Sequence, residues 1–305
     1  MTLPTPSLHW KFALVGYGEV GQILAEDLRR IGLAVAACDL EAGGSAGAAM
    51  RRHAADNGVS LSDSHSAAVA GADLVISAVT ASQTVAAAAA CASALKAGAF
   101  FLDFNSASPA AKIEAAGLVD AAGGRYVEGA VMTSIPPYRI RVPLLLGGPH
   151  AVALEEHLGV LGFDARVASA KLGVASATKM CRSVMIKGLE AMVIESFTAA
   201  RAYGVEDAVL ASLAETFPGI DWEKQGAYFF QRVIQHGRRR TEEMREAAQT
   251  VREAGLEPWS AAGTAERQAW VAAFADRGLF GDRNAPRKDW RADADRILAA
   301  TQKQS

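Results

Sequence analysis

The chain has 305 residues, half of them hydrophobic and 21% charged, which fits two globular domains with a sizeable core. The net charge of −2 gives no sign of a nucleic-acid-binding surface. The longest apolar stretch, 84–95, is too short and too rich in alanine to span a bilayer.

The cysteines and histidines bear on compartment and metal content. Cys38, Cys91 and Cys181 are far apart and form no CxxC pair, so we interpret them as buried apolar residues in a reducing compartment. Segment 1–11 has no charged start followed by an apolar core, unlike a signal peptide. The six histidines show no metal-binding spacing. We therefore expect a cytoplasmic protein without a metal site.

A glycine-rich turn follows the first apolar run. Residues 12–15 read as a buried strand, and from residue 20 apolar residues recur at helical spacing. Glycines at this junction permit a tight turn, close approach of a pyrophosphate and close packing of helix on strand. The turn therefore predicts a dinucleotide site whose candidate residues are Gly16, Tyr17, Gly18, Glu19, Val20 and Gly21.

The second strand, 34–38, is followed by Asp39, 18 residues beyond Gly21. A carboxylate at this offset binds ribose hydroxyls of NAD and repels the 2′-phosphate of NADP. Leu40 and Glu41 cannot pair with a phosphate, so we predict NAD. Arg51 and Arg52, a helix away, leave NADP open.

Strands and helices alternate through the first half of the chain. Beyond residue 39 we expect strands at 59–61, 73–79, 99–104, 125–131 and 142–148, and helices at 82–96 and 108–123. Ser108 caps the latter helix and Pro109 takes its first position. This alternation predicts a doubly wound, mostly parallel α/β domain of the Rossmann type over residues 1–168.

The second half, 169–305, reads as an all-α domain that binds substrate and dimerises. We expect helices at 173–204, 206–216, 221–236, 239–254 and 262–276, and only loose periodicity from residue 282 onward. The helix at 173–204 would be about 45 Å long. It has apolar residues on several faces, which indicates a bundle core or a homodimer interface.

Three segments together resemble the β-hydroxyacid dehydrogenase superfamily, which includes 3-hydroxyisobutyrate and 6-phosphogluconate dehydrogenases. They are "FLDFNSASP" at 101–109, "YVEGAVMTSIPP" at 126–137 and "LGVASATKMCRS" at 172–183. The resemblance runs over nearly the whole chain. It is closest to a branch with a C-terminal domain of unknown function.

The resemblance implies that Lys179, six residues after Gly173, is the general acid/base. A neutral amine can take the hydroxyl proton of an alcohol, and burial beside a nicotinamide favours the neutral form. The alternative is a solvated helix lysine. We interpret Lys187, two turns further on, as a supporting or interface cation.

The chain departs from the family where substrates bind. Met132, Thr133 and Ser134 replace a Ser-Gly-Gly, Ser183 replaces an asparagine, and Glu242-Glu243 replaces a frequent Lys-Asp. We therefore expect the substrate to be a hydroxy acid or a bulkier, even aromatic, hydroxy compound. We expect Met132, Thr133, Ser134 and Ser183 to bind it, the alternatives being an ordinary loop and a helix serine bonded to its own backbone.

Two predicted strands end in polar residues at the carboxyl edge of the sheet, where open α/β sheets bind ligands. Val79 and Thr80 would lie against the cofactor, and Asn105 would contact cofactor or substrate unless it caps the following helix. Arg238, Arg239 and Arg240 read as a solvated face with helical ion pairs, or else one arginine reaches the active site.

The leading function is a nicotinamide-dependent dehydrogenase or reductase acting on a small-molecule hydroxy or keto compound. An imine reductase shares the two-domain plan, but such enzymes usually place another residue where this chain has Lys179. A non-catalytic dinucleotide sensor would keep the glycine turn and have no need of that lysine.

Overall fold

The computed structural model describes residues 9–45 and 47–302. They form two compact units, which divide between Met180 and Cys181. The units divide inside a long helix, twelve residues beyond the Ala168 boundary of the sequence analysis. Segment 1–8, which includes most of the stretch judged unlike a signal peptide, lies outside the described residues.

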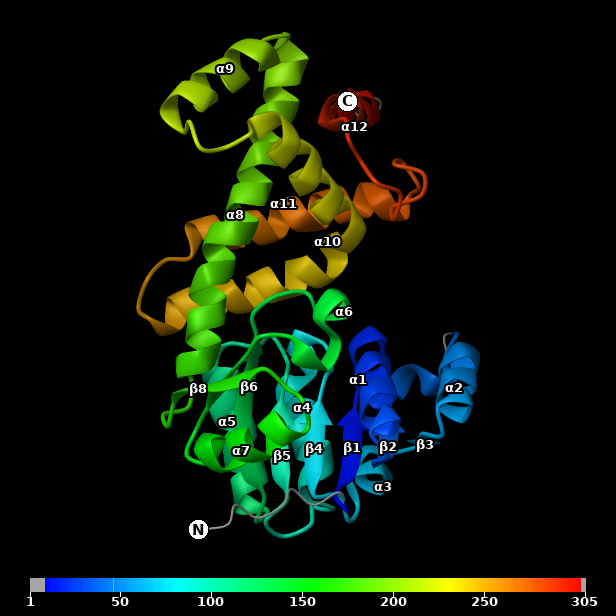
Figure 1. Ribbon diagram of the computed structural model, residues 1–305. Coiled ribbons are helices and arrows are strands. Elements are labelled where there is room, and N and C mark those ends of the chain that lie inside the picture. The colour runs from blue at the N-terminus through cyan, green and yellow to red at the C-terminus, as the bar shows by residue number, and fades with distance from the viewer. Residues whose placement is uncertain (1–8, 46, 303–305) are drawn as a thin grey trace. The chain divides into compact units, whose positions relative to one another are not determined.

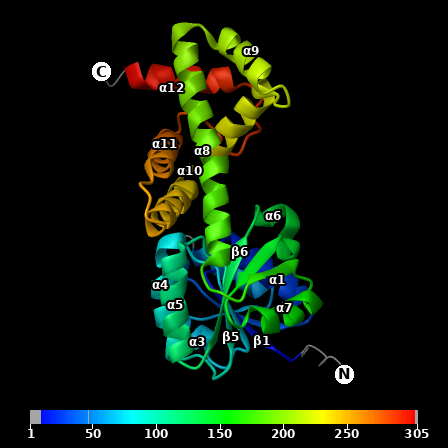
Figure 2. The same cartoon turned by 90° about the vertical axis from the view of Figure 1, so that its left-hand side faces the viewer.

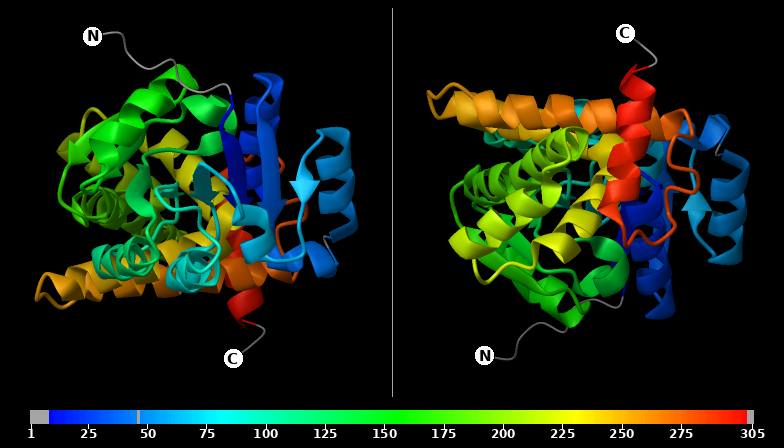
Figure 3. Two further views of the ribbon diagram at one scale, coloured as in Figure 1. Left: turned by 90° about the horizontal axis from the view of Figure 1, so that it is seen from below. Right: turned by 90° about the horizontal axis from the view of Figure 1, so that it is seen from above.

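The first unit is built on one eight-stranded sheet with the order β3-β2-β1-β4-β5-β6-β7-β8 (Figure 1). All neighbours are parallel except β6 and β7. Figures 1 and 3 place β3 and α2 at one outer edge. The strands are β1 Lys11–Val15, β2 Ala34–Cys38, β3 Ser60–Leu61, β4 Leu74–Ser77, β5 Phe100–Asp103, β6 Arg125–Val131, β7 Leu144–Gly147 and β8 Ala165–Ser169.

Helices cover both faces of this sheet, as the doubly wound prediction requires. In Figure 2, α3, α4 and α5 lie on one face, and α1 and α7 lie on the other. Each face buries its own apolar cluster. The helices are α1 Glu19–Arg30, α2 Gly47–Asp56, α3 His65–Val69, α4 Thr84–Ala92, α5 Pro109–Ala121, α6 Ile135–Tyr138 and α7 Ala151–Val160, with short 3-10 turns η1 Leu40–Gly43, η2 Ala81–Gln83 and η3 Arg139–Arg141.

The predicted fold class is confirmed, since an α/β domain is followed by helices. The Ser108 cap is present, since its Oγ accepts the Ala111 amide at 3.4 Å. The elements α2, α3, α7 and β8 were not predicted. In α7 the buried residues Ala151, Leu154 and Leu158 do share one helix face, but Val152 and Val160 on the exposed side are apolar too, which leaves little polar contrast in the sequence. Strand β8 alternates between half-buried and exposed residues, but it is only five residues long.

The second unit is helical, with α9 Glu206–Thr216, α10 Trp222–Glu253, α11 Trp259–Asp276 and α12 Trp290–Gln302. The long helix α8, Val174–Tyr203, begins in the first unit and continues into the second. An apolar core gathers aromatic side chains from four of these helices, among them Phe197, Phe230, Phe274 and Trp290.

The prediction of separate helices at 221–236 and 239–254 is wrong, because α10 runs unbroken through both and changes direction near its middle (Figure 1). Gly237 and the arginines after it interrupted the apolar pattern. The glycine is needed for packing instead, since a Cβ there would lie 3.0 Å from the Ala272 Cβ on α11. The charged tail after residue 282 likewise contains a helix, α12.

The cysteine interpretation needs one correction. Cys38 and Cys91 are buried, but Cys181 on α8 is exposed. Burial raises the pKa of the Cys91 thiol to about 12. Within the described part of the chain, no helix is both long and apolar enough to cross a membrane.

Candidate active site

The glycine turn between β1 and α1 has the geometry of a phosphate-binding turn. Gly16 has φ +96°, and a Cβ there would collide with the carbonyl of Ala78. A Cβ at Gly21 would collide with the carbonyl of Gly16, so helix and turn pack at closest approach. By contrast, a Cβ at Gly18 would meet no atom within 4 Å. That open space lies at the start of α1, whose N-cap residue offers no side-chain oxygen to the first-turn amides. The turn therefore fits a pyrophosphate.

Asp39 ends β2 beside this turn. Its Oδ2 accepts the Tyr17 amide at 2.6 Å and its Oδ1 accepts the Glu41 amide at 2.9 Å. These bonds orient the carboxylate at the carboxyl edge of the sheet, where a ribose hydroxyl could share its remaining lone pairs. Arg51 is exposed and donates to the carbonyl of Ala42 at 2.5 Å, which places a guanidinium on the same loop.

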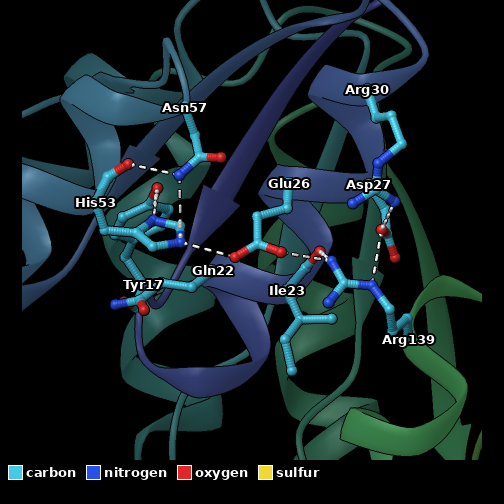
Figure 4. Close-up of polar contacts among 9 residues, drawn as sticks. All are labelled: Tyr17, Gln22, Ile23, Glu26, Asp27, Arg30, His53, Asn57 and Arg139. Atoms are coloured by element: carbon cyan, nitrogen blue, oxygen red, sulfur yellow. Dashed lines mark hydrogen bonds and ion pairs between the residues drawn. The ribbon is translucent and has the colours of Figure 1, made fainter.

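A chain of polar contacts runs from the glycine turn along α1 (Figure 4). The Tyr17 hydroxyl meets His53 Nδ1 at 2.9 Å, and His53 Nε2 meets Glu26 Oε1 at 3.0 Å. Burial, followed by the Glu26 charge, raises the pKa of Tyr17 to about 12. Tyr17 is fully buried, so its side chain anchors the turn to α2 through His53.

The same series of polar contacts continues to the loop after β6. Arg139 donates to Glu26 at 2.6 Å and to Asp27 at 2.9 Å, and the Ile140 amide donates to Asp27 at 3.1 Å. Hydrogen bonds from His53 and Arg139 lower the pKa of the Glu26 carboxyl. Arg139 has φ +55°, the one positive φ among the described non-glycine residues. Such strain persists where its surroundings enforce it, and here the ion pairs do so.

That loop carries the predicted substrate-binding residues. Met132 and Ser134 are half-buried and Thr133 is exposed. They lie between β6 and α6, and Arg139 ties the far end of this stretch to α1. Substrate binding by the three residues stays a prediction.

The end of β5 is organised by a buried ion pair. Lys112 Nζ lies 2.9 Å from Asp103 Oδ1, and each side chain is 1% exposed. Asp103 also accepts the Tyr126 hydroxyl at 2.6 Å and the Asn105 amide at 2.8 Å. Burial, followed by the Asp103 charge, raises the pKa of Tyr126. These bonds shape the turn 103–106 at the carboxyl edge.

Asn105 joins this turn to the neighbouring strand. Its Oδ1 accepts the Val79 amide at 2.8 Å and its Nδ2 donates to Ser77 Oγ at 3.0 Å. The side chain is buried and links the ends of β4 and β5, rather than capping α5 as the alternative had it. Thr80 is exposed one residue after Val79. The predicted ligand contacts of these three residues remain to be tested.

Lys179 reaches the same edge from α8. Its Nζ donates to Ser106 Oγ at 2.6 Å, so the amine lies at the turn that Asp103 organises. Gly173, with φ +88°, precedes α8, and a Cβ there would lie 3.2 Å from the Cβ of Pro109 on α5. The solvated-lysine alternative does not describe this side chain, which is half-buried and engaged.

A buried glutamate holds the first turn of α8. Glu128 on β6 is fully buried, and its carboxylate accepts the Ala175 amide at 3.0 Å and the Ser176 hydroxyl at 2.9 Å. Gly147 on β7 pairs with Glu128 and leaves room for its side chain, since a Cβ at Gly147 would collide with the carboxylate. An anion at a helix N-terminus is favourable. Lys179 therefore lies one turn beyond a tethered helix start.

Ser183 belongs to the second unit, where it is buried and accepts a bond from Lys187 Nζ at 3.3 Å. Lys187 is buried too and pairs with Glu243 Oε2 at 2.7 Å. The solvated-face interpretation holds for Arg238 and Arg239 but is wrong for Arg240, which is 4% exposed. Arg240 pairs with the buried Glu190 of α8.

Among the residues described, no group of three or more His, Cys, Asp or Glu side chains could hold a metal ion.

Four residues of this site were not predicted, namely Ser106, Lys112, Glu128 and Arg139. A usable signal existed for Glu128 and for Asp103, since each is a charged residue within or at the end of an apolar strand and must find a partner there. No local pattern marks Arg139, whose partner Asp27 is 112 positions away.

Two family models match parts of the chain. Residues 11–139 match the model of the NAD binding domain of 6-phosphogluconate dehydrogenase. Residues 200–271 match a domain of unknown function (DUF1932). An uncharacterized 28.5 kDa protein from Methanothermus fervidus is 29% identical over 161 residues, which are 52% of this chain and 60% of that protein. The chain thus spans less than two thirds of this curated relative.

Two solved structures are similar over most of the chain. A conserved hypothetical protein from Sinorhizobium meliloti 1021 is 38% identical, with a TM-score of 0.75, 96% of this chain and 97% of that chain covered. A conserved protein of unknown function, described as structurally similar to 3-hydroxyacid dehydrogenases, is 28% identical, with a TM-score of 0.66, 87% of this chain and 99% of that chain covered. The chain therefore belongs to the β-hydroxyacid dehydrogenase superfamily, in the branch that carries this C-terminal domain of unknown function.

Proposed function

We propose that the protein is an NAD-dependent dehydrogenase or reductase that interconverts a hydroxy compound and its keto form, with Lys179 as the general acid/base. The observation that carries the proposal is the 2.6 Å contact between Lys179 Nζ and Ser106 Oγ. It puts an amine at the carboxyl edge of a sheet that also holds a phosphate-binding turn, which is where this fold binds ligands.

When bound, the nicotinamide would accept hydride from the alcohol carbon or return it to the carbonyl carbon. The chain itself handles the proton. In oxidation, neutral Lys179 Nζ takes the hydroxyl proton as the carbonyl forms, and in reduction the ammonium returns a proton to the alkoxide. Ser106 orients the amine by sharing a hydrogen bond with it. Asp103 and Glu128 hold the two segments that carry Ser106 and Lys179.

For the cofactor, Asp39 supports NAD, because a carboxylate at the end of the second strand of this fold can accept ribose hydroxyls and repels a 2′-phosphate. For the substrate, the loop 132–134 supports a hydroxy acid or a bulkier hydroxy compound, since the apolar Met132 stands where the family has a small residue that binds the substrate carboxylate. The buried free thiols Cys38 and Cys91 support a reducing, cytoplasmic location.

We also propose a homodimer, supported by exposed apolar side chains on α8. Met185 and Met192 are 73% and 62% exposed and lie seven residues apart, which is two turns on one helix face.

The test is turnover with a panel of hydroxy acids and uncharged hydroxy compounds, each with NAD and NADP, in wild type and in Lys179→Ala. Binding of NAD should be followed by calorimetry in the same proteins. Turnover that Lys179→Ala abolishes without loss of NAD binding supports the proposal. Binding of NAD with no turnover of any compound would favour the dinucleotide sensor.

A further inference from the structure

The helical unit contains a cluster of charged side chains that the proposed chemistry does not use. Lys187 and Glu190 come from α8, and Arg240 and Glu243 come from α10. All four are less than 10% exposed. They form two ion pairs, Lys187 with Glu243 and Arg240 with Glu190. Buried pairs of this kind are stable only when each charge is matched.

The cluster holds more cations than carboxylates. Arg239 adds a third cation and shares Glu243 with Lys187, its Nη1 lying 2.6 Å from Oε1. Arg232 adds a fourth cation, two turns before Arg239 on α10. Glu190 and Glu243 are the carboxylates that act on these groups. Arg239 is 58% exposed and solvated, so the charge that lacks a matching carboxylate in the buried part of the cluster is that of Arg232.

Arg232 is the side chain whose charge is least matched. It is half-buried, and no hydrogen bond or ion pair joins it to any other described residue. Burial, followed by repulsion from Arg240, lowers the pKa of its guanidinium. A guanidinium has five N–H donors, and leaving them without acceptors inside a protein is costly.

Two neighbours on α10 extend the same donor surface. His236 and Arg240 follow Arg232 at intervals of four residues, so the three lie along one side of the helix. Burial and then the three arginines lower the pKa of His236 to about 4, so its ring is neutral at pH 7 and has an N–H to donate. The buried Nε of Arg240 has no hydrogen-bond partner among the described residues.

We infer that Arg232, with His236 and Arg240, binds a small oxyanion, namely a carboxylate or phosphate group. Such a group is planar or tetrahedral, and a guanidinium can grip two of its oxygens at once. It would supply the negative charge that Glu190 and Glu243 leave missing. The inference goes beyond the proposed function, because it requires neither Lys179 nor a bound dinucleotide.

The site is tested by titrating the whole protein with inorganic phosphate and, separately, with acetate. The ring signals of His236 in the NMR spectrum report binding, and His236→Asn assigns them. We expect saturable shifts in wild type and an affinity at least about tenfold lower in Arg232→Gln, which loses a charge-assisted bidentate contact. Arg238→Gln is the matched control, because Arg238 is exposed on the same helix and pairs with Asp276.

The result that overturns the site is equal anion affinity in wild type and Arg232→Gln, or no shift of His236 with either anion. Arg232→Lys guards against misfolding, since it keeps the charge and should retain weaker binding. The anion that binds with the higher affinity shows whether phosphate or carboxylate is the preferred group.

Turnover then separates the two sources of the anion. If Arg232→Gln raises KM only for anionic members of the substrate panel, the anion belongs to the substrate. If KM is unchanged while phosphate binding is lost, a free anion occupies the site. Absence of all turnover would refute the proposed function, and the NMR titration would still decide the site.

Discussion

At the scale of single residues, the chemistry depends on where one amine lies. We expect Lys179→Ala to lower kcat at least about a hundredfold, the usual scale for loss of a general acid or base. NAD affinity should change little, because the glycine turn and Asp39 are untouched. Steady-state kinetics and calorimetry measure the two effects. Lys171→Ala, an exposed lysine of the same unit, is the control. Normal turnover by Lys179→Ala would refute the assignment.

Cofactor choice is also decided by individual side chains. We expect kcat/KM to favour NAD(H) over NADP(H) at least about tenfold, which corresponds to about 1.4 kcal/mol. Asp39→Ser combined with Leu40→Arg should shrink or invert the preference. Serine removes the charge yet can still accept the Glu41 amide as a cap, and Leu40 is 72% exposed, so arginine fits there.

Both cofactors are compared in wild type and in the double variant, with Leu40→Ala as the control for loss of the leucine alone. Equal or faster turnover of wild type with NADP(H) would mean that Arg51, already on this loop, binds the 2′-phosphate.

At the scale of elements, Glu128 couples strand β6 to the helix that carries Lys179. Glu128→Ala leaves the Ala175 amide without its buried acceptor, a loss of about 1–3 kcal/mol, whereas the Ser176 hydroxyl can still donate to the Gly173 carbonyl at 3.1 Å. We expect kcat to fall at least about tenfold while KM for NAD is unchanged, because the start of α8 is released and the glycine turn is not.

Glu128→Gln keeps one carbonyl oxygen for the Ala175 amide and should fall between wild type and Glu128→Ala. Ser176→Ala, which removes only the hydroxyl partner, is the matched control. Thermal unfolding and kinetics are measured on all three. Equal loss of kcat and of NAD affinity in Glu128→Ala would indicate general destabilisation and not positioning.

The loop after β6 gives a second test at this scale. Arg139→Ala removes the ion pairs with Glu26 and Asp27 and leaves a strained φ, whereas Arg139→Gly removes the same pairs and relieves the strain. We expect the glycine variant to be the more stable of the two by about 1 kcal/mol in urea unfolding. Equal stabilities would show that the backbone there relaxes once the guanidinium is gone.

Predictability also differs between elements. The strands β1 and β2, the glycine turn and the start of α5 are specified by residues next to one another, so the sequence predicts them well. The sequence predicts two helices in place of α10, because the residue against which Gly237 packs, Ala272, lies on α11. The tether at Glu128 involves a residue 47 positions later, and no local pattern contains that information.

At the scale of the whole molecule, we expect a homodimer with a light-scattering mass near twice 31.9 kDa. Met185→Glu with Met192→Glu places charges on an exposed apolar face of α8 and should produce monomers. Val160→Glu changes an equally exposed apolar residue of the other unit and should leave the mass unchanged. A wild-type mass near that of one chain contradicts the proposal.

Cys181 offers a practical consequence for experiments. It is exposed, whereas Cys38 and Cys91 are buried and burial raises the pKa of both thiols. A thiol-reactive fluorophore should therefore label the native protein at one position. That position is two residues beyond Lys179, at the first residue of the helical unit. A labelled protein would report the arrival of cofactor or substrate as a change in emission, even before a compound that it turns over is known.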